Sequence, residues 1–473
     1  MVFHHLAKET LIYGGSDFFT RALAFIAFPL IATALSPKAF GSVELITTVT
    51  AMLGLFMSCG LNNSVQRYYW DKDTKIIERP VVVSSGLVTQ ALFGFAVLIL
   101  GLLILPFILP MIQKAKLPLT QVALVAALLS MVFSQLLQYL LDVTRLHFSP
   151  WKFFILSMMF RVSSMLLAVV AVVNLKWGID GLFAVQAFAA LLILPIAIWM
   201  VKKDITLKMD KKWTQELVTF GYPFIFAGVA YWLFGSIDRW MLASMSSIEE
   251  VGIYSVSFRF ASIVLFVSIA FGQAWSPLAI KIRTDHPNVY RNIYAKVLLI
   301  LLYIMLIIGG GVGLFSGEII YLIMPPEYQR SAMPLIILCI GVILQATQQI
   351  TAIGISLEKK SFLFARLAGL SAVINAILNW FLIPSFGATG AAWATSITYL
   401  VLTISYMVYT QKLHTLPIDW FKLAVLLLLG TIVFLVAILL HQSSISVYVL
   451  IYKLLIAITC LIIGWFVLPK RSL

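Results

Sequence analysis

Long apolar runs dominate this sequence and constrain its fold more than any other feature. A helix needs about 20 mostly apolar residues to cross a bilayer, and each run reaches that length. Strands of a membrane β-barrel would instead show ~10-residue segments of alternating polarity. The runs lie at roughly residues 10–35, 39–61, 81–110, 117–141, 151–174, 179–201, 213–242, 251–280, 293–324, 331–357, 361–383, 388–410, 421–441 and 446–468. The sequence therefore predicts an all-α polytopic membrane protein with about 14 transmembrane helices.

The composition excludes most soluble activities. Charged residues make up 11% of the chain, against ~25% in soluble domains, and no extended polar stretch is left for a catalytic domain. The three cysteines lie in separate runs and the six histidines form no metal-ligand spacing. We expect no enzyme activity, no metal site and no cofactor, while coupling to H+ or Na+ stays open. The net charge of +14 does not indicate nucleic-acid binding, because most basic residues lie in short loops beside apolar runs.

The distribution of basic residues predicts the orientation in the membrane. Lys and Arg are retained on the cytoplasmic side of a membrane. One set of alternate loops and chain ends carries 22 of them, whereas the other set carries only 5. With an even number of spans, this asymmetry places both termini in the cytoplasm.

An internal repeat divides the predicted spans into two halves. Four landmarks recur in the same order at offsets of 205 to 211 residues. They are Arg161 with Asn174 and Arg366 with Asn379, the corners Gly178/Gly181 and Gly387/Gly390, Leu137-Gln138 and Leu344-Gln345, and the turns at 36–41 and 247–252. We expect two six-helix lobes, residues 1–205 and 206–411, and two additional helices in residues 412–473. Six spans return the chain to its starting side, so a pseudo-two-fold axis along the membrane normal relates the lobes and a substrate cavity lies between them, as in transporters.

Four arginines inside the apolar runs are the candidate substrate-binding residues. A charge at mid-membrane costs roughly 2.5–3.5 kcal/mol on insertion scales, so these side chains should face protein or water. Arg259 is the strongest candidate, because it lies ~12 Å deep in its predicted helix and has no acid three or four residues away. Arg161 and Arg366 occupy equivalent repeat positions, where a substrate role and a snorkelling role are both open. Arg21 can bind substrate or pair with Asp17 four residues earlier on the same helix.

Three acids in or beside the runs are the candidate ion-coupling or counter-ion residues. They are Asp17, Glu44 and Asp238. Each can bind a coupling ion or a proton, or can neutralise a nearby arginine. The sequence leaves both roles open.

Several motifs resemble one family of membrane transporters. Asp238-Arg239, residues 249–255 (Glu-Glu-Val-Gly-Ile-Tyr-Ser) and Arg259-Phe260 are similar to the corner between the seventh and eighth helices of bacterial polysaccharide flippases. The second set is Asn375, Leu378-Asn379, Ile383-Pro384, residues 387–392 and Ala394-Thr395, and the third is Leu35-Ser36-Pro37 with Phe40-Gly41 and Glu44. These flippases belong to the multidrug/oligosaccharidyl-lipid/polysaccharide (MOP) exporter superfamily, and the resemblance covers the first twelve helices.

The resemblance implies a MATE-like fold and a Wzx-like function. Such a protein would move an undecaprenyl-diphosphate-linked oligosaccharide, an O-antigen or exopolysaccharide repeat unit, across the bacterial inner membrane by alternating access. Its implied partners are membrane lipids, the lipid-linked oligosaccharide, and the polysaccharide polymerase and assembly proteins of lipopolysaccharide synthesis. Arginine forks suit a diphosphate headgroup. Many O-antigen flippases have twelve spans, whereas fourteen is typical of lipid II flippases, so the lipid-linked substrate stays open.

Two other functions are compatible with part of this pattern. A cation-coupled multidrug antiporter of the same fold would use Asp17 and Asp238 as ion or drug sites, but it needs an acidic cavity. Here four intramembrane arginines stand against three acids, which favours an anionic substrate. A membrane scaffold without transport would leave the intramembrane arginines unexplained.

Overall fold

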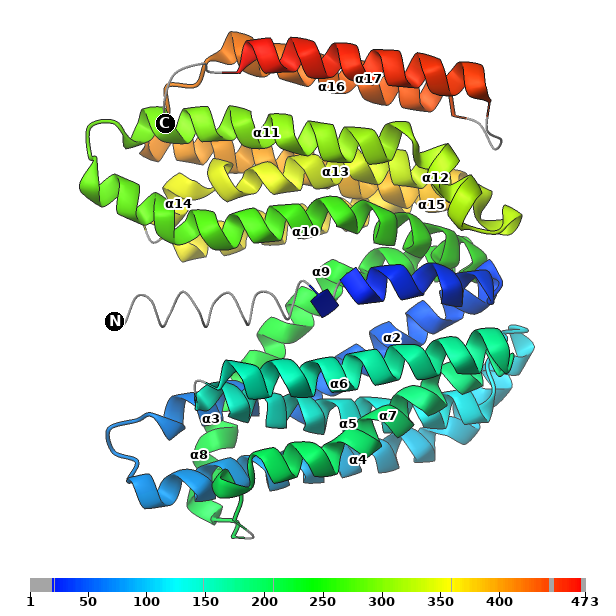
Figure 1. Ribbon diagram of the computed structural model, residues 1–473. Helices are drawn as coiled ribbons and strands as arrows, with labels where there is room; N and C mark the ends of the chain where they lie inside the picture. Colours follow the sequence, from blue (N-terminus) through cyan, green and yellow to red (C-terminus); the bar gives the residue numbers. More distant parts are fainter. Residues whose placement is uncertain are drawn as a thin grey trace. The chain divides into compact units, whose positions relative to one another are not determined.

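The structure, a computed structural model, describes residues 19–20, 22–147, 149–206, 208–358, 360–441 and 446–468. Among these residues every regular element is helical, which confirms the all-α class. The chain divides into two compact units, Met1–Ile237 and Asp238–Leu473, and Figure 1 labels their helices. The first unit holds α2 (Pro37–Ser58), α3 (Leu61–Tyr69), α4 (Arg79–Lys114), α5 (Gln121–Leu146), α6 (Pro150–Val169), α7 (Gly178–Met200), α8 (Lys211–Gly221) and the first part of α9 (Pro223–Met245). The second unit holds the rest of α9, then α10 (Ile248–Asp285), α11 (Tyr290–Leu314), α12 (Ser316–Ile323), α13 (Ala332–Thr351), α14 (Ile353–Leu357), α15 (Ser361–Leu413), α16 (Trp420–Leu439) and α17 (Val447–Val467).

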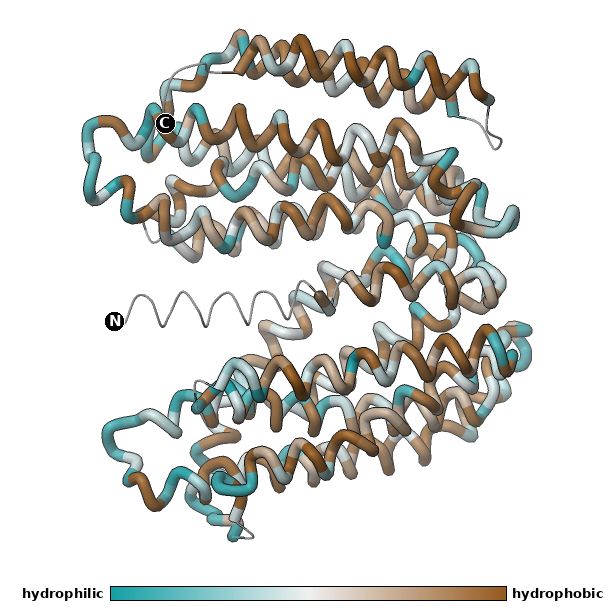
Figure 2. Tube along the Cα trace, viewed as in Figure 1, coloured by the Kyte–Doolittle hydropathy of each residue, from teal (hydrophilic) through white to brown (hydrophobic). Residues whose placement is uncertain are grey.

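The described helices account for the predicted number of spans. Twelve are long and apolar enough to cross a membrane, and the segment Ala22–Thr33 is a shorter apolar helix within the first predicted run. One of the twelve, Phe362–Leu413, contains two predicted spans, because the backbone leaves the helical conformation at Gly387. Figure 2 shows hydrophobic residues along the helices and hydrophilic residues gathered at many of the turns. These findings confirm a polytopic membrane protein with about 14 spans.

The repeat landmarks correspond to equivalent backbone features in the two units. Ser36 caps the start of α2 by accepting a hydrogen bond from the amide of Ala39 at 3.2 Å, and Ser247 caps α10 in the same way at 3.2 Å. These caps satisfy amide groups that have no partner inside the helix. The corner glycines Gly178 and Gly387 both have positive φ, +60° and +52°, where a residue with a Cβ is strained. The two halves therefore share helix starts and corners.

A tight turn separates α2 from α3 at the end of the predicted run 39–61. Helix α2 ends at Ser58 and α3 begins at Leu61, because Cys59 and Gly60 both adopt left-handed backbone conformations with φ of 46° and 65°. Gly60 lies against the backbone of Gly221, where a side chain would not fit. The break lets the polar residues after position 61 continue as a separate amphipathic helix.

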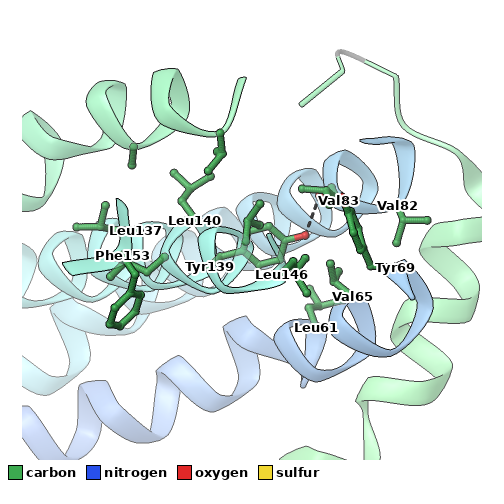
Figure 3. Close-up of a cluster of buried hydrophobic side chains, with 14 of the residues drawn as sticks. Leu61, Val65, Tyr69, Val82, Val83, Leu137, Tyr139, Leu140, Leu146 and Phe153 are labelled. Atoms are coloured by element: carbon green, nitrogen blue, oxygen red, sulfur yellow. Dashed lines mark hydrogen bonds between the residues drawn. The ribbon is translucent and has the colours of Figure 1, made fainter. Parts of the chain in front are cut away.

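A hydrophobic core joins α3 to its neighbours in the first unit. Figure 3 shows Leu61, Val65 and Tyr69 of α3 with side chains of α4, α5 and α6. Inside this core the hydroxyl of Tyr139 donates a hydrogen bond of 2.7 Å to the carbonyl oxygen of Val83. The first part of α9 belongs to the same unit, since the indole of Trp232 donates to the carbonyl oxygen of Thr48 at 2.7 Å. This packing fixes the ends of α3 and α5, where a polar pocket lies.

Candidate functional site

A buried acid cluster links α9, α10 and α15 in the second unit. Asp238 of α9 is 9% exposed. One of its carboxylate oxygens, Oδ2, accepts a short hydrogen bond from the Tyr254 hydroxyl, and the same hydroxyl lies 3.3 Å from Thr395 Oγ1. The other, Oδ1, accepts from the amide of Arg239 at 2.8 Å. Asp238 is therefore held directly by polar groups of α9 and α10, and Thr395 of α15 contacts it only through Tyr254.

Arg239 supplies the positive charge of this cluster. Its Nη1 lies 3.7 Å from Asp238 Oδ1, and both side chains are only 12% exposed. The guanidinium also lies 5.4 Å from the ring centre of Phe258 and 5.9 Å from that of Tyr254. Cation–π contacts of this kind strengthen when water is excluded. Arg239 was not among the candidate residues predicted from the sequence, although its position directly after Asp238 was a usable signal.

The predicted arginines occupy different environments. Arg259 of α10 is half-buried, whereas Arg161 of α6 and Arg366 of α15 are exposed on their helices. Arg21 lies outside the described residues, as does Asp17. The roles of these four arginines in binding stay predictions.

Glu44 and Glu250 are buried carboxylates at the helix starts that the repeat relates. Glu44 of α2 is 8% exposed and Glu250 of α10 is 7% exposed. Oε2 of Glu250 accepts from the amide of Ala388 at 2.7 Å, and Oε1 bonds to the guanidinium of Arg330. A Cβ at Gly387 would collide with this carboxylate. Glu250 therefore anchors the corner inside α15, a role that the sequence analysis missed.

A polar pocket lies between α3 and α5 in the first unit. Its volume is about 190 Å³, and its polar lining comes from Asn62, Asn63, Gln66, Asp142 and Arg145. Asp142 accepts from Asn62 Nδ2 at 2.6 Å and from Arg145 Nη1 at 3.3 Å. The side-chain amide oxygen of Asn62, Oδ1, is buried without a hydrogen-bond partner among the described residues. Amide, carboxylate and guanidinium groups in one pocket can bind a ligand that both donates and accepts hydrogen bonds.

A buried ion pair attaches the last helix to the rest of the second unit. Lys453 of α17 is 1% exposed, and its Nζ lies 2.8 and 2.9 Å from the two carboxylate oxygens of Glu318 in α12. Tyr303 of α11 makes a second attachment by donating to the carbonyl oxygen of Leu461 at 2.8 Å. Between these points α11, α16 and α17 enclose an apolar cavity of about 210 Å³. This pair was not predicted from the sequence, although a lysine within an apolar run is a signal that it has a partner.

Comparison with known proteins identifies the family. The family model described as polysaccharide biosynthesis protein matches residues 6–283, more than half of the chain. The chain belongs to this family. This confirms the predicted resemblance to polysaccharide biosynthesis proteins, and the fold is shared with solved transporters of the MOP superfamily.

Two curated relatives are distant in sequence. A Haloferax volcanii protein named "probable low-salt glycan biosynthesis flippase Agl15" is 23% identical over 267 residues, which cover 54% of this chain and 56% of that protein. A protein of the Lsg locus of Haemophilus influenzae is 20% identical over 280 residues, 57% of this chain and 65% of that protein. The matched region thus spans less than two thirds of either relative.

Solved structures establish the shared fold over nearly the whole chain. The lipid II flippase MurJ in an inward closed conformation matches with a TM-score of 0.75 at 15% identity, covering 96% of this chain and 98% of that one. An inward-facing multidrug resistance MATE transporter matches with a TM-score of 0.61 at 16% identity, covering 83% and 94%. At these identities the likeness is one of fold, because one transporter fold carries several substrates.

Proposed function

We propose that this membrane protein is a flippase that moves an undecaprenyl-diphosphate-linked oligosaccharide, an O-antigen or exopolysaccharide repeat unit, between membrane leaflets by alternating access. One observation carries the proposal: a member of a polysaccharide biosynthesis family consists, over its described residues, almost entirely of helices that can span a membrane. A chain built this way contributes to polysaccharide synthesis most directly by moving a lipid-linked intermediate. The flippase name of the Haloferax relative supports this reading.

The expected substrate is anionic in its headgroup and apolar in its tail. Arginine binds phosphate oxygens through two parallel hydrogen bonds, and such bonds gain strength where water is scarce. Half-buried Arg259 in an apolar helix suits this role, with Arg21, Arg161 and Arg366 as further candidates. The polar pocket beside Asp142 suits a hydroxyl-rich sugar.

The hydrogen bonds of Asp238 favour a flippase with an anionic substrate over a cation-coupled antiporter. The carboxylate of Asp238 already accepts hydrogen bonds from Tyr254 and Arg239, so it matches a counter-ion better than an open cation site. We therefore include an H+ or Na+ gradient in the proposal only as an energy source for translocation. Dependence of translocation on either gradient is the measurement that decides it.

We place the protein in the bacterial cytoplasmic membrane with both termini in the cytoplasm. The asymmetry of 22 to 5 basic residues supports this orientation. Translocation would then run from the cytoplasmic to the periplasmic leaflet. Polymerase and assembly proteins would act on the product.

Substitution of Arg259 tests the proposed function. In proteoliposomes containing a fluorescent undecaprenyl-diphosphate oligosaccharide, Arg259→Lys keeps the charge but loses the planar fork, so we expect a partial defect in translocation. Arg259→Glu reverses the charge and should abolish translocation while membrane abundance stays near wild type. Lys152→Glu, at an exposed position, is the matched control. Full activity of Arg259→Glu would remove Arg259 from the mechanism, and failure of the wild-type protein to move the lipid would refute the proposed function.

A further inference from the structure

A histidine–carboxylate pair joins two loops at the basic end of the first unit. We use "basic end" for the end of each unit that carries the lysine- and arginine-rich loops. His147 directly follows α5, and Asp204 lies in the short helical turn after α7. His147 Nε2 lies 2.7 Å from Asp204 Oδ2. Asp204 is 7% exposed and the His147 side chain is 38% exposed, so the carboxylate is shielded from water while the imidazole is partly open to it. This shielding distinguishes the contact from a fully exposed ion pair, whose contribution is small.

The second unit has the same kind of pair at its basic end. Glu358 follows α14 and His414 follows α15. His414 Nε2 lies 2.8 Å from Glu358 Oε1, and the histidine side chain is 7% exposed. The hydrogen bond from His414 lowers the pKa of Glu358 below its ordinary value. Arg283 Nη2 adds a second donor to the same carboxylate oxygen at 3.2 Å.

The two pairs are related by the internal repeat, with acid and histidine exchanged. Glu358 lies 211 residues after His147, and His414 lies 210 residues after Asp204. Both offsets fall within the 205 to 211 residues of the other landmarks. Each pair therefore joins the loops that follow the fourth and sixth spans of its unit. Each unit therefore has a histidine–carboxylate contact at an equivalent place, although the histidine and the acid have exchanged positions.

A tyrosine completes each pair from a third segment. Tyr69, the last residue of α3, places its hydroxyl 3.4 Å from His147 Nε2 and 3.4 Å from Asp204 Oδ1. Tyr290, the first residue of α11, places its hydroxyl 2.9 Å from His414 Nδ1. Arginines support both tyrosines. Arg79 lies 5.2 Å from the ring centre of Tyr69, and Arg291 Nε donates to the Tyr290 hydroxyl at 3.1 Å.

We propose that these two groups are repeat-related clasps that close the basic end of each unit, so that each bundle moves as one rigid body during transport. His147, Asp204, Glu358 and His414 are positioning residues, since they connect loops and make no assigned contact with substrate. The part that concerns transport rests on the proposed flippase function. The closure itself is a property of the protein without substrate and is measured separately.

Exchange variants test the clasps. His147→Glu alone sets two carboxylates against each other, whereas His147→Glu with Asp204→His installs the order found in the second unit. In purified full-length protein, we expect the single substitution to raise hydrogen exchange roughly tenfold in the amides next to Asp204, the loss typical of one charge-assisted hydrogen bond. The double substitution should restore protection to within about twofold of wild type. Lys212→Glu, which disturbs a partly exposed ion pair at 4.0 Å and a contact with the Trp213 ring at 5.3 Å, should leave protection next to Asp204 unchanged.

The outcomes separate the clasp from the proposed function. Unchanged protection in the single variant, or a double variant no better than the single one, would overturn the clasp. Lost protection with undiminished translocation would overturn its part in transport. If wild-type protein does not translocate lipid-linked sugar, the flippase proposal fails while the protection data still judge the clasp. Should His147→Glu fail to fold, His147→Gln and Asp204→Asn remove the imidazole and the carboxylate one at a time, and each should raise hydrogen exchange in the same amides.

Discussion

Removing the ammonium group of Lys453 should loosen the last helix from the second unit. Among the described residues of α17 only Lys453 and Gly464 are buried. The first is held by Glu318 and the second lies against Tyr303. Lys453→Met keeps a long apolar side chain but leaves the Glu318 carboxylate, 8% exposed, without its cation. The N-terminal half of α17 then has no attachment comparable to the lost ion pair.

The expected loss of stability comes from leaving the Glu318 carboxylate buried without a partner, rather than from the lost attraction between the two charges. Breaking one partner of a buried ion pair typically costs about 3–5 kcal/mol, because the other charge stays buried without compensation. A loss of this size corresponds to a fall in melting temperature on the order of 10 °C for a unit of this length. Replacing both partners, as in Lys453→Met with Glu318→Leu, should recover most of the loss, since well-packed apolar pairs are often as stable as buried ion pairs. Lys422→Met, which breaks a partly exposed pair at 3.4 Å, should cost at most about 1 kcal/mol.

A native cysteine reports the local opening. Cys460 of α17 lines the apolar cavity between α11, α16 and α17, whereas Cys59 and Cys339 are buried. Lys453→Met should speed maleimide labelling of Cys460 in detergent and lower the melting temperature together, and the double variant should reverse both effects. A double variant as unstable as the single one would refute the reasoning, because the cost would then not come from an unpaired Glu318. Unchanged labelling with a lowered melting temperature would show that the pair stabilises the unit without holding α17 in place.

Three further predictions concern the acid cluster, the helix corners and pH. Tyr254→Phe removes a donor to the buried Asp238 carboxylate and should cost about 1.5–3 kcal/mol in thermal unfolding, whereas Tyr231→Phe, at a side chain 79% exposed, should cost almost nothing. Gly387→Ala meets both positive φ and the Glu250 carboxylate, so it should destabilise more than Gly178→Ala, which meets positive φ and open space; equal losses of melting temperature would contradict the Glu250 contact. The His414 hydrogen bond lowers the pKa of Glu358 from its ordinary value of 4.5, so the stabilisation is complete above that value and is lost as pH falls through the lower folded value. Wild-type and Glu358→Gln melting temperatures should therefore converge only in that acidic range, and convergence near neutral pH would contradict the assignment.

The number and type of helices followed from the sequence because they depend on local properties. The length of an apolar run is a property of consecutive residues, and lipid permits only helices for such runs. The backbone conformation of the turn after α2 depends instead on contacts between distant residues. Cys59 is a non-glycine residue in a left-handed conformation, which is uncommon, and its position is fixed by packing of Gly60 against Gly221, a contact between distant residues.

The candidate site was harder to predict, because burial and pairing depend on contacts between helices. Asp238 was a candidate as an acid in or at the edge of a span, but the Tyr254 hydroxyl that donates to it comes from α10, and Thr395 beside that hydroxyl comes from α15. Lys453 and Glu318 are 135 residues apart in sequence, and no periodicity within either helix indicates the other. Arg239 and Glu250 were visible only as parts of a family motif. Charge type was therefore readable from the sequence, whereas the identity of each partner was not.

The repeat preserves backbone geometry at the corners and helix starts, whereas the histidine and the carboxylate at the basic ends have exchanged places. A corner with positive φ accepts glycine far better than other residues, so Gly178 and Gly387 stay recognisable at equivalent positions. A histidine–carboxylate pair has no such backbone restriction, because either of the two loops that it joins can supply the acid. In the first unit Asp180, beside Gly178, accepts from Thr120 at 2.6 Å, whereas in the second unit Glu250 reaches the amide next to Gly387 from a different helix. The exchanged histidine and carboxylate at the basic ends follow the same rule. A repeat detected through its glycines therefore indicates where contacts between segments recur. The structure is required to show which side chains make those contacts.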